Sequence, residues 1–381
     1  MLDTFKILIV IDKFKGSLTS FQACFAIKKG IEKRWEDLFP SLNLSIEALP
    51  MADGGEGTLD VVEKSIGGIR HYASVSDPLF REIKVPFLLK NKTAFIEMAL
   101  CSGLQLLTKD EYNPMITSTY GLGELILEAV RYGAEDIVIG IGGSATNDGG
   151  MGMLKALGYE FFDRRGDEAL SLNEVYEISD FNVSQSLHKV KFTVACDVTN
   201  PLLGEKGASI VYAPQKGATP EMVEKLEIGM RNYAEICERF TGRCCRDYPG
   251  SGAAGGIGFA FKLFFDAEII PGWMILSRLT NMEKLISTAD LVITGEGSLD
   301  QQSVSGKLVY GVCMTGIMYN KSIWAFCGIN HLNVNELSNL GISKVFEIIT
   351  VARDIDDSIK NASYYLEQMA FNAISFLSPK P

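Results

Sequence analysis

The sequence predicts an α/β protein of two domains. The chain has 381 residues, of which 47% are hydrophobic. A chain of this length and composition exceeds what a single compact core usually holds, so two domains are expected. Short β-branched runs alternate with stretches of helical periodicity, which is typical of parallel strands joined by crossover helices. Residues 69–107 interrupt this alternation with a pattern of antiparallel strands. We therefore expect a discontinuous domain with a mainly parallel sheet built from both chain ends, and an inserted domain with a mixed sheet.

The elements of the discontinuous domain follow from the apolar spacing. Residues 19–34 carry apolar side chains at helical spacing, with Ser17, Thr19 or Ser20 available as the N-cap. Residues 354–376 have the pattern of a single amphipathic closing helix. The predicted strands are 6–11, 44–49, 291–294, 322–326 and 345–349.

The inserted domain is predicted from the segment 69–107, where an antiparallel pattern interrupts the alternation of strands and helices. Residues 83–89 and 94–98 indicate antiparallel strands turned by "KNK", and further strands are expected at 136–141 and 192–196. We place the discontinuous domain at 1–65 plus 284–381 and the inserted domain at 66–283.

Composition excludes several classes of partner. The 36 basic and 47 acidic residues give a net charge of -11, which opposes binding to nucleic acid or to an anionic membrane surface. Eight scattered cysteines without a CxxC pair indicate neither a zinc site nor a disulfide framework, and they favour the reducing cytoplasm. The most apolar stretch, residues 256–276, contains Lys262, Asp266 and Pro271 and is not expected to span a membrane.

Five predicted strands end in loops of similar composition. These loops read "DKFKGSLTS", "PMADGGEGT", "GGSATNDGG", "DVTNPLLG" and "GEGSLDQQSVSGK". Ligands of parallel sheets bind beyond the carboxyl ends of the strands, where glycines and hydroxyl or amide donors suit phosphate oxygens. Carboxylates beside such donors repel phosphate unless a cation lies between them. One such loop is usually only a tight connection, but five together favour phosphoryl transfer with Mg²⁺.

Other motifs are weaker. "GSGAAG" at 250–255 matches the dinucleotide pattern GxGxxG but does not follow a strand, so a hinge or a close helix approach is favoured. Arg81 in "DPLFREI" could bind a substrate carboxylate bidentately, or could be a solvated loop arginine. The three histidines show no motif, which argues against a Ser-His-Asp hydrolase.

The ordered motifs resemble the type I glycerate kinase family over almost the whole chain. The matches include "PMADGGEGTLD", "IGIGGSATNDGGMGMLKALG", "ACDVTNPLLGEKGASIVYAPQKGAT" and "LVITGEGSLDQQSVSGK". The resemblance implies two α/β domains and ATP-dependent transfer of the γ-phosphate to a hydroxyl of D-glycerate. Two positions depart from the family pattern: Lys13 replaces the usual serine, and Phe80 replaces the usual glycine before Arg81.

Residue chemistry at these positions suggests roles. We expect Asp197 to be the general base or a substrate-orienting carboxylate, with Asp300 as the competing candidate and Lys15 neutralising phosphate charge. Mg²⁺ would be held by Asp53 and Glu56, directly or through water. The residues predicted to bind phosphate or substrate are Ser17, Arg81, Gly143, Ser144, Thr146, Asn147, Lys216 and Lys307.

Two other functions stay open on the sequence. The strand-glycine-helix signals also suit a nicotinamide-dependent oxidoreductase, and a phosphometabolite-binding protein without catalysis would have the same loops. The sequence also leaves open whether the 2- or 3-hydroxyl is phosphorylated, and whether the protein is a monomer or a homodimer.

Overall fold

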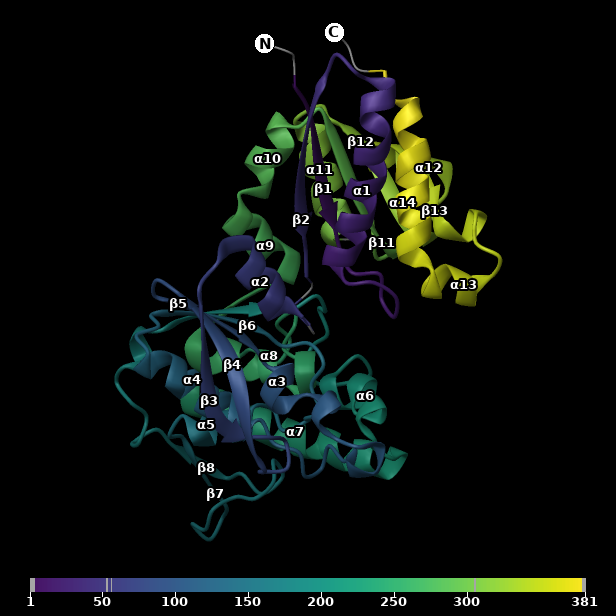
Figure 1. The fold of residues 1–381 in the computed structure, drawn as a ribbon. Coiled ribbons are helices and arrows are strands. Elements are labelled where there is room, and N and C mark those ends of the chain that lie inside the picture. Colours follow the sequence, from purple (N-terminus) through teal and green to yellow (C-terminus); the bar gives the residue numbers. More distant parts are fainter. Residues whose placement is uncertain (1–3, 53, 56, 305, 379–381) are drawn as a thin grey trace. The chain divides into compact units, whose positions relative to one another are not determined.

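The chain folds into two compact units. The computed structural model describes residues 4–52, 54–55, 57–304 and 306–378. Unit 1 comprises Met1–Ala52 and Trp273–Pro381, and unit 2 comprises Asp53–Gly272 (Figure 1). Each unit has its own sheet with helices on it, so the predicted fold class is confirmed.

Unit 1 contains a five-stranded parallel sheet in the order β13-β12-β11-β1-β2. Its strands are β1 (Thr4–Ile11), β2 (Asn43–Pro50), β11 (Leu291–Leu299), β12 (Ser322–Asn330) and β13 (Ile342–Glu347). The first strand lies at an inner position, with Ile7 opposite Leu291 on one side and opposite Ile46 on the other. Its isoleucines are fully buried, as expected for a strand covered on both faces.

The helices of unit 1 follow the predicted pattern with one exception. Helix α1 (Ser20–Leu38) begins after Thr19, whose side chain accepts the Gln22 amide in a capping box. It packs beside α14 (Ala362–Ala373), and Gly30 permits the close approach because a Cβ there would lie 2.2 Å from the Glu367 carbonyl oxygen (Figure 1). The other helices are α9 (Gly272–Thr280), α10 (Met282–Thr288), α11 (Leu308–Met318), α12 (Val334–Asn339) and α13 (Ile355–Lys360).

The single closing helix predicted over 354–376 is wrong. The segment forms α13, α14 and a final 3₁₀ turn at Ile374–Phe376, with a break at Asn361. Asp357 accepts hydrogen bonds from Asn361 Nδ2 at 2.7 Å and from Tyr365 Oη at 2.6 Å across this break. Local side-chain bonding of this kind competes with a continuous helix.

Unit 2 contains a six-stranded mixed sheet in the order β10-β9-β6-β5-β4-β3. Its strands are β3 (Ile69–Ser76), β4 (Glu82–Lys90), β5 (Thr93–Glu97), β6 (Asp136–Gly140), β9 (Lys191–Ala195) and β10 (Glu268–Ile270). The predicted antiparallel pair is present as β4 and β5, and the pairs from β5 to β10 are parallel. A separate hairpin joins β7 (Glu160–Phe162) and β8 (Glu177–Ser179).

The helices of unit 2 enclose one apolar core around this sheet. They are α2 (Thr58–Ile66), α3 (Ala99–Ser102), α4 (Tyr120–Arg131), α5 (Met151–Ala156), α6 (Ala208–Tyr212), α7 (Pro220–Thr241) and α8 (Ile257–Phe265). No helix in the described parts of the chain has the length and hydrophobicity that a membrane crossing requires.

The units divide at Ala52 and Trp273, whereas the sequence places the boundaries near 65 and 284. Helix α2 packs on strands β4 and β5, so it lies with unit 2. The Trp273 indole donates to the Gly306 carbonyl at 2.8 Å and lies against Gly311, where a Cβ would come within 2.2 Å of the ring. These contacts place the start of α9 with unit 1.

Candidate functional site

The loop after β6 is the most enclosed of the predicted site segments. Gly143 has a φ of +76°, which favours glycine, and it is exposed, while Ser144, Thr146 and Asn147 are buried. Ala145 is fixed on both sides, since its amide donates to the Ser102 carbonyl and its carbonyl accepts from Thr117 Oγ1, each at 2.9 Å. The loop is therefore held in one shape.

Two further groups anchor this loop from later in the chain. Lys216 Nζ donates to Ser144 Oγ at 2.7 Å and to the Thr146 carbonyl oxygen at 2.6 Å. Asn147 Nδ2 donates to Ser209 Oγ on α6 at 3.0 Å. Lys216 is only 2% exposed, and burial lowers the pKa of its ammonium to about 7 although nearby Asp148 raises it.

The loop also retains two unpaired polar atoms, a hydroxyl that can donate or accept and an amide oxygen that can only accept. Thr146 Oγ1 and Asn147 Oδ1 are buried and have no hydrogen-bond partner among the residues that the structure describes. Leaving such an oxygen unpaired costs about 1–3 kcal/mol. Asn147 and Asp148 also line a cavity of about 820 Å³, within the range of small-molecule sites. The loop thus combines a fixed shape, unpaired polar atoms and adjacent space.

The GxGxxG-like segment supports the same loop by close packing. Gly255 has a φ of +71°, and a Cβ there would lie 2.0 Å from the Thr146 carbonyl oxygen. A Cβ at Gly252 would lie 2.1 Å from the Pro201 carbonyl oxygen. The glycines at 250–255 thus permit close approach to two loops, whereas the sequence predicts a hinge or a close helix approach.

Asp197 follows β9 and is exposed, so it is not part of the core. Its Oδ1 accepts the amide of Gly272, the first residue of α9, at 3.0 Å. The neighbouring parallel strand β6 leads into the Gly143 loop, so both segments lie at the carboxyl edge of the same sheet.

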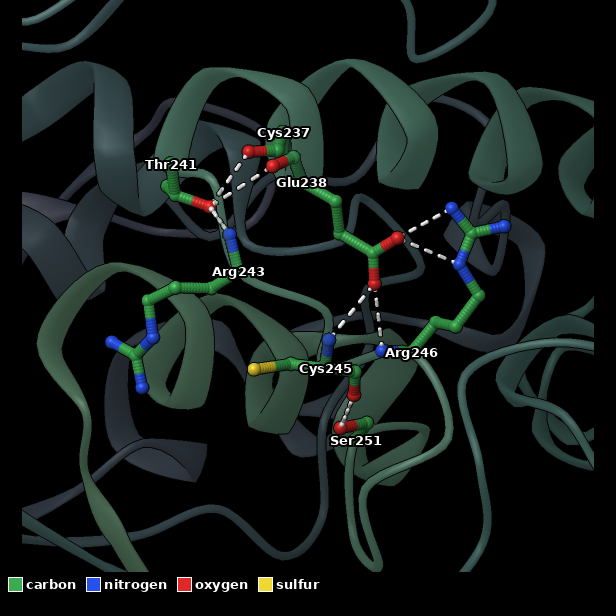
Figure 2. A network of polar contacts seen from close by, with 7 residues as sticks. All are labelled: Cys237, Glu238, Thr241, Arg243, Cys245, Arg246 and Ser251. Atoms are coloured by element: carbon green, nitrogen blue, oxygen red, sulfur yellow. Dashed lines mark hydrogen bonds and ion pairs between the residues drawn. The ribbon is translucent and has the colours of Figure 1, made fainter.

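A polar network at the end of α7 joins Glu238 to Cys245 and Arg246 (Figure 2). Glu238 Oε1 accepts the amides of Cys245 and Arg246 at 2.9 Å, and its Oε2 accepts the Arg246 guanidinium. The Arg246 carbonyl in turn accepts the Leu202 amide at 2.8 Å, and the Asn200 carbonyl accepts the Gly252 amide at 2.9 Å. The loop after β9 is thus tied to α7.

Arg81 is exposed, but its guanidinium is engaged on three sides. It donates to Asp77 at 2.5 Å, to Glu111 at 2.8 Å and to the Leu106 carbonyl at 3.1 Å. The Asp77 carboxylate raises the pKa of Arg81 further. Phe80, at the position where the family usually has glycine, has a φ of +63°, which is strained for a bulky side chain.

In unit 1 the loop after β1 carries Lys15 and Ser17. Lys15 is exposed, and Ser17 Oγ donates to the Ile359 carbonyl at 2.5 Å. This loop adjoins the end of β11, since a Cβ at Gly297 would lie 3.3 Å from the Lys15 amide nitrogen.

The loop after β11 brings Asp300 and Lys307 together around a residue that the sequence reasoning missed, Glu296. Ser303 Oγ donates to Glu296 Oε1 at 2.6 Å and accepts the Asp300 amide at 3.0 Å. Lys307 Nζ lies 3.9 Å from Glu296 Oε2. Burial raises the pKa of Glu296, which is 9% exposed, although Ser303 and Lys307 lower it in part. An acid between two glycines at a strand end, "GEG", was the available signal.

The two predicted metal ligands, Asp53 and Glu56, lie outside the described residues. Elsewhere in the described chain, no three His, Cys, Asp or Glu side chains gather as a metal cluster. Mg²⁺ usually takes one or two carboxylates together with water and phosphate oxygens, so a pair of acids fits its chemistry. Gly54, which lies between them in sequence, packs on the end of β9, where a Cβ would lie 2.7 Å from Ala195 Cβ.

The predicted site residues therefore form two groups. In unit 2 the structure brings Ser144, Thr146 and Lys216 into direct contact, while Asp197 and Arg81 are held by other partners. In unit 1 it brings Asp300 and Lys307 around Glu296.

Comparison with known proteins assigns the chain to a family. The profile of the glycerate kinase family matches residues 7–378. The chain is 40% identical to a glycerate kinase of Halalkalibacterium halodurans, with 96% of each chain covered, and 39% identical to a glycerate 2-kinase of Escherichia coli, with 94% of each covered. A crystal structure from Salmonella typhimurium LT2, provisionally described as glycerate kinase 2, superposes with a TM-score of 0.84 at 37% identity over 98% of both chains. The chain belongs to the glycerate kinase family.

Proposed function

We propose that the protein is an ATP-dependent kinase that transfers the γ-phosphate to a hydroxyl of D-glycerate, giving phosphoglycerate and ADP. The observation that carries this proposal is full-length similarity to relatives named glycerate kinase. The glycine- and hydroxyl-rich loops at the carboxyl ends of β1, β6 and β11 are typical of phosphate binding and support the proposal. Family membership favours a kinase over the nicotinamide oxidoreductase and over a protein that only binds phosphometabolites.

The acceptor hydroxyl must lose its proton as the phosphoryl group is transferred. Asp197 is our first candidate for the proton acceptor, because it is an exposed carboxylate at the carboxyl end of a buried strand. Asp300 remains the competitor, and its amide is fixed by Ser303. In this proposal, whichever of the two carboxylates is not the base orients a substrate or stabilises its own loop.

Anionic groups of the two substrates need fixed donors and positive charge. Lys15 and Lys307 are exposed or half-buried and can reach phosphate oxygens, and Ser17 adds a hydroxyl beside Lys15. Hydrogen-bond donors for the phosphate or the glycerate carboxylate would come from the loop of Gly143, Ser144, Thr146 and Asn147. Arg81 would bind the glycerate carboxylate with the part of its guanidinium that stays exposed.

Asp53 and Glu56 are the residues that we propose to hold Mg²⁺. When bound, the ion would neutralise charge on the phosphate oxygens.

We further propose phosphorylation at the 2-hydroxyl and a cytoplasmic location. The name of the Escherichia coli relative, glycerate 2-kinase, supports the first. All eight cysteines are free thiols, as expected in a reducing compartment.

The test is turnover with ATP, Mg²⁺ and D-glycerate, followed by ADP formation and by phosphorus NMR of the product. We expect ADP and 2-phosphoglycerate in equal amounts. A 3-phosphoglycerate product would refute the regiochemistry alone. Binding of glycerate without ADP formation, or a change in NADH absorbance with a nicotinamide cofactor, would refute the kinase.

A further inference from the structure

Lys216 is the only buried lysine or arginine among the described residues. It ends the 3₁₀ turn at Pro214–Lys216, and the next residue, Gly217, has a φ of +95°. A Cβ at Gly217 would lie 2.2 Å from the Tyr112 carbonyl oxygen, so the backbone is closely docked at this point. The backbone position from which the Lys216 side chain extends is therefore fixed.

The amine of Lys216 is directed entirely at one loop. Its two hydrogen bonds go to Ser144 Oγ and to the Thr146 carbonyl oxygen, 72 and 70 residues earlier in the chain. An ammonium has three N–H donors and a neutral amine has two. The two bonds match the donor capacity of the neutral amine, and burial leaves the nitrogen no solvent to complete a third.

We propose that Lys216 is a positioning residue that shapes the Gly143–Asn147 loop through Ser144 and Thr146, and that it takes up a proton when the loop binds an anionic group of a substrate. This inference rests on the proposed function, which supplies the anionic substrates. It gives Lys216 an indirect role in place of direct contact with phosphate.

The electrostatic surroundings support the proton uptake. Burial lowers the pKa of Lys216 to about 7, so both forms are present near neutral pH. Asp148, on the loop after β6, is the charged group that acts on it, and that carboxylate accepts bonds from Thr119 and from the Gly150 and Gly152 amides. The two hydrogen-bond partners of the Lys216 amine, Ser144 Oγ and the Thr146 carbonyl oxygen, are uncharged. An added anion on the loop favours the ammonium form.

The test compares wild type with Lys216→Met, using Lys189→Met, an exposed lysine of unit 2 that does not line the cavity, as the matched control. KM and kcat are measured for ATP and for D-glycerate from pH 6 to pH 9. For the substrate whose anion occupies the loop, we expect the wild-type KM to rise about tenfold as pH increases through 7, which corresponds to about one pKa unit between free and bound states. Lys216→Met should give a high KM that does not change with pH, with kcat within about threefold.

Ser144→Ala and the double variant separate positioning from direct contact. Because Lys216 acts through Ser144, we expect the two substitutions to be non-additive in KM. Additive effects, a wild-type KM that is flat with pH for both substrates, or a loss confined to kcat would overturn the inference. If thermal unfolding shows that Lys216→Met does not fold, the pH profile of Ser144→Ala decides, since it should be flatter than that of wild type. Absence of any glycerate phosphorylation by wild type would refute the proposed function instead.

Discussion

The strand-end loops of the two units have similar compositions but opposite environments. In unit 2, Ser144, Thr146 and Asn147 are buried and are anchored from α6 and from Lys216. In unit 1, Lys15 is exposed and Lys307 is half-buried, 3.9 Å from Glu296 Oε2. Fixed donors need little rearrangement on binding, whereas exposed lysines lose side-chain entropy of up to about 2 kcal/mol each. The loop of unit 2 is therefore a fixed polar segment, whereas the lysines of unit 1 are mobile charges.

The largest expected effect decides which unit carries the base. Asp197→Asn in unit 2 keeps the side-chain shape and its ability to accept the Gly272 amide, but it removes basicity. We expect kcat to fall by about 100- to 10,000-fold, the usual contribution of a general base. If Asp300 only stabilises its loop, Asp300→Asn in unit 1 should cost much less, because an asparagine oxygen can still accept the Gln302 amide that Asp300 Oδ1 accepts at 2.8 Å.

Both variants are compared by steady-state turnover, with thermal unfolding to confirm the fold. The reverse order, a large loss for Asp300→Asn and near-normal turnover for Asp197→Asn, would move the base to unit 1.

The next largest effect is expected for the exposed or half-buried lysines of unit 1. Lys307→Met and Lys15→Met should each raise the KM for ATP by about 10- to 100-fold, since a hydrogen bond to a charged group is worth about 1.5–3 kcal/mol. Melting temperatures should hardly change, because neither lysine is buried. Lys29→Met on α1 is the matched control and should leave KM unchanged. A shift in stability without a shift in KM would show that these lysines are structural.

The smallest effect contrasts two carboxylates, the partly buried Glu238 in unit 2 and the buried Glu296 in unit 1. Burial alone would raise the pKa of Glu238, but hydrogen bonds from Arg246 and from the Cys245 amide lower it overall. A lowered pKa means that Glu238 stabilises the fold above its unfolded pKa, and that this stabilisation is lost as pH falls through the folded value. Glu238→Gln should therefore cost about 1.5 kcal/mol at pH 7 and less below about pH 4.

Glu296→Gln should cost less than Glu238→Gln, or should stabilise. Its raised pKa shows that the fold disfavours the charged form, so its contribution falls as pH rises above the unfolded value. Denaturant unfolding at pH 4 and pH 7 measures both variants. Equal costs at pH 7 would contradict the difference in their environments.

The sequence predicts long buried elements better than short ones. The apolar runs of β1 and β11 and the spacing of α1 are strong signals, and these elements are present. Strands β7, β8 and β10 have only three residues each, which is too short for a periodic pattern. The break at Asn361 was hidden because it depends on side-chain bonds to Asp357 and not on apolar spacing.

The candidate site divides in the same way. The glycine and hydroxyl content of the loops predicts which of them could bind a ligand, including the loop of Ser144. The burial of Lys216 was not predictable, because it depends on a 3₁₀ turn that docks against Tyr112, distant in sequence. Glu296 was visible in "GEG", but its burial depends on the Ser303 contact from the far end of its loop.

The inner position of β1 sets an order of assembly during translation. On one side β1 pairs with β11, through Ile7 and Leu291, so this half of the sheet must wait until most of the chain has left the ribosome. All strands of unit 2 are synthesised in between, so that unit can complete its core first. Until β11 is available, the apolar residues of β1 lack their partner on that side, so we expect exposed hydrophobic surface in the nascent chain.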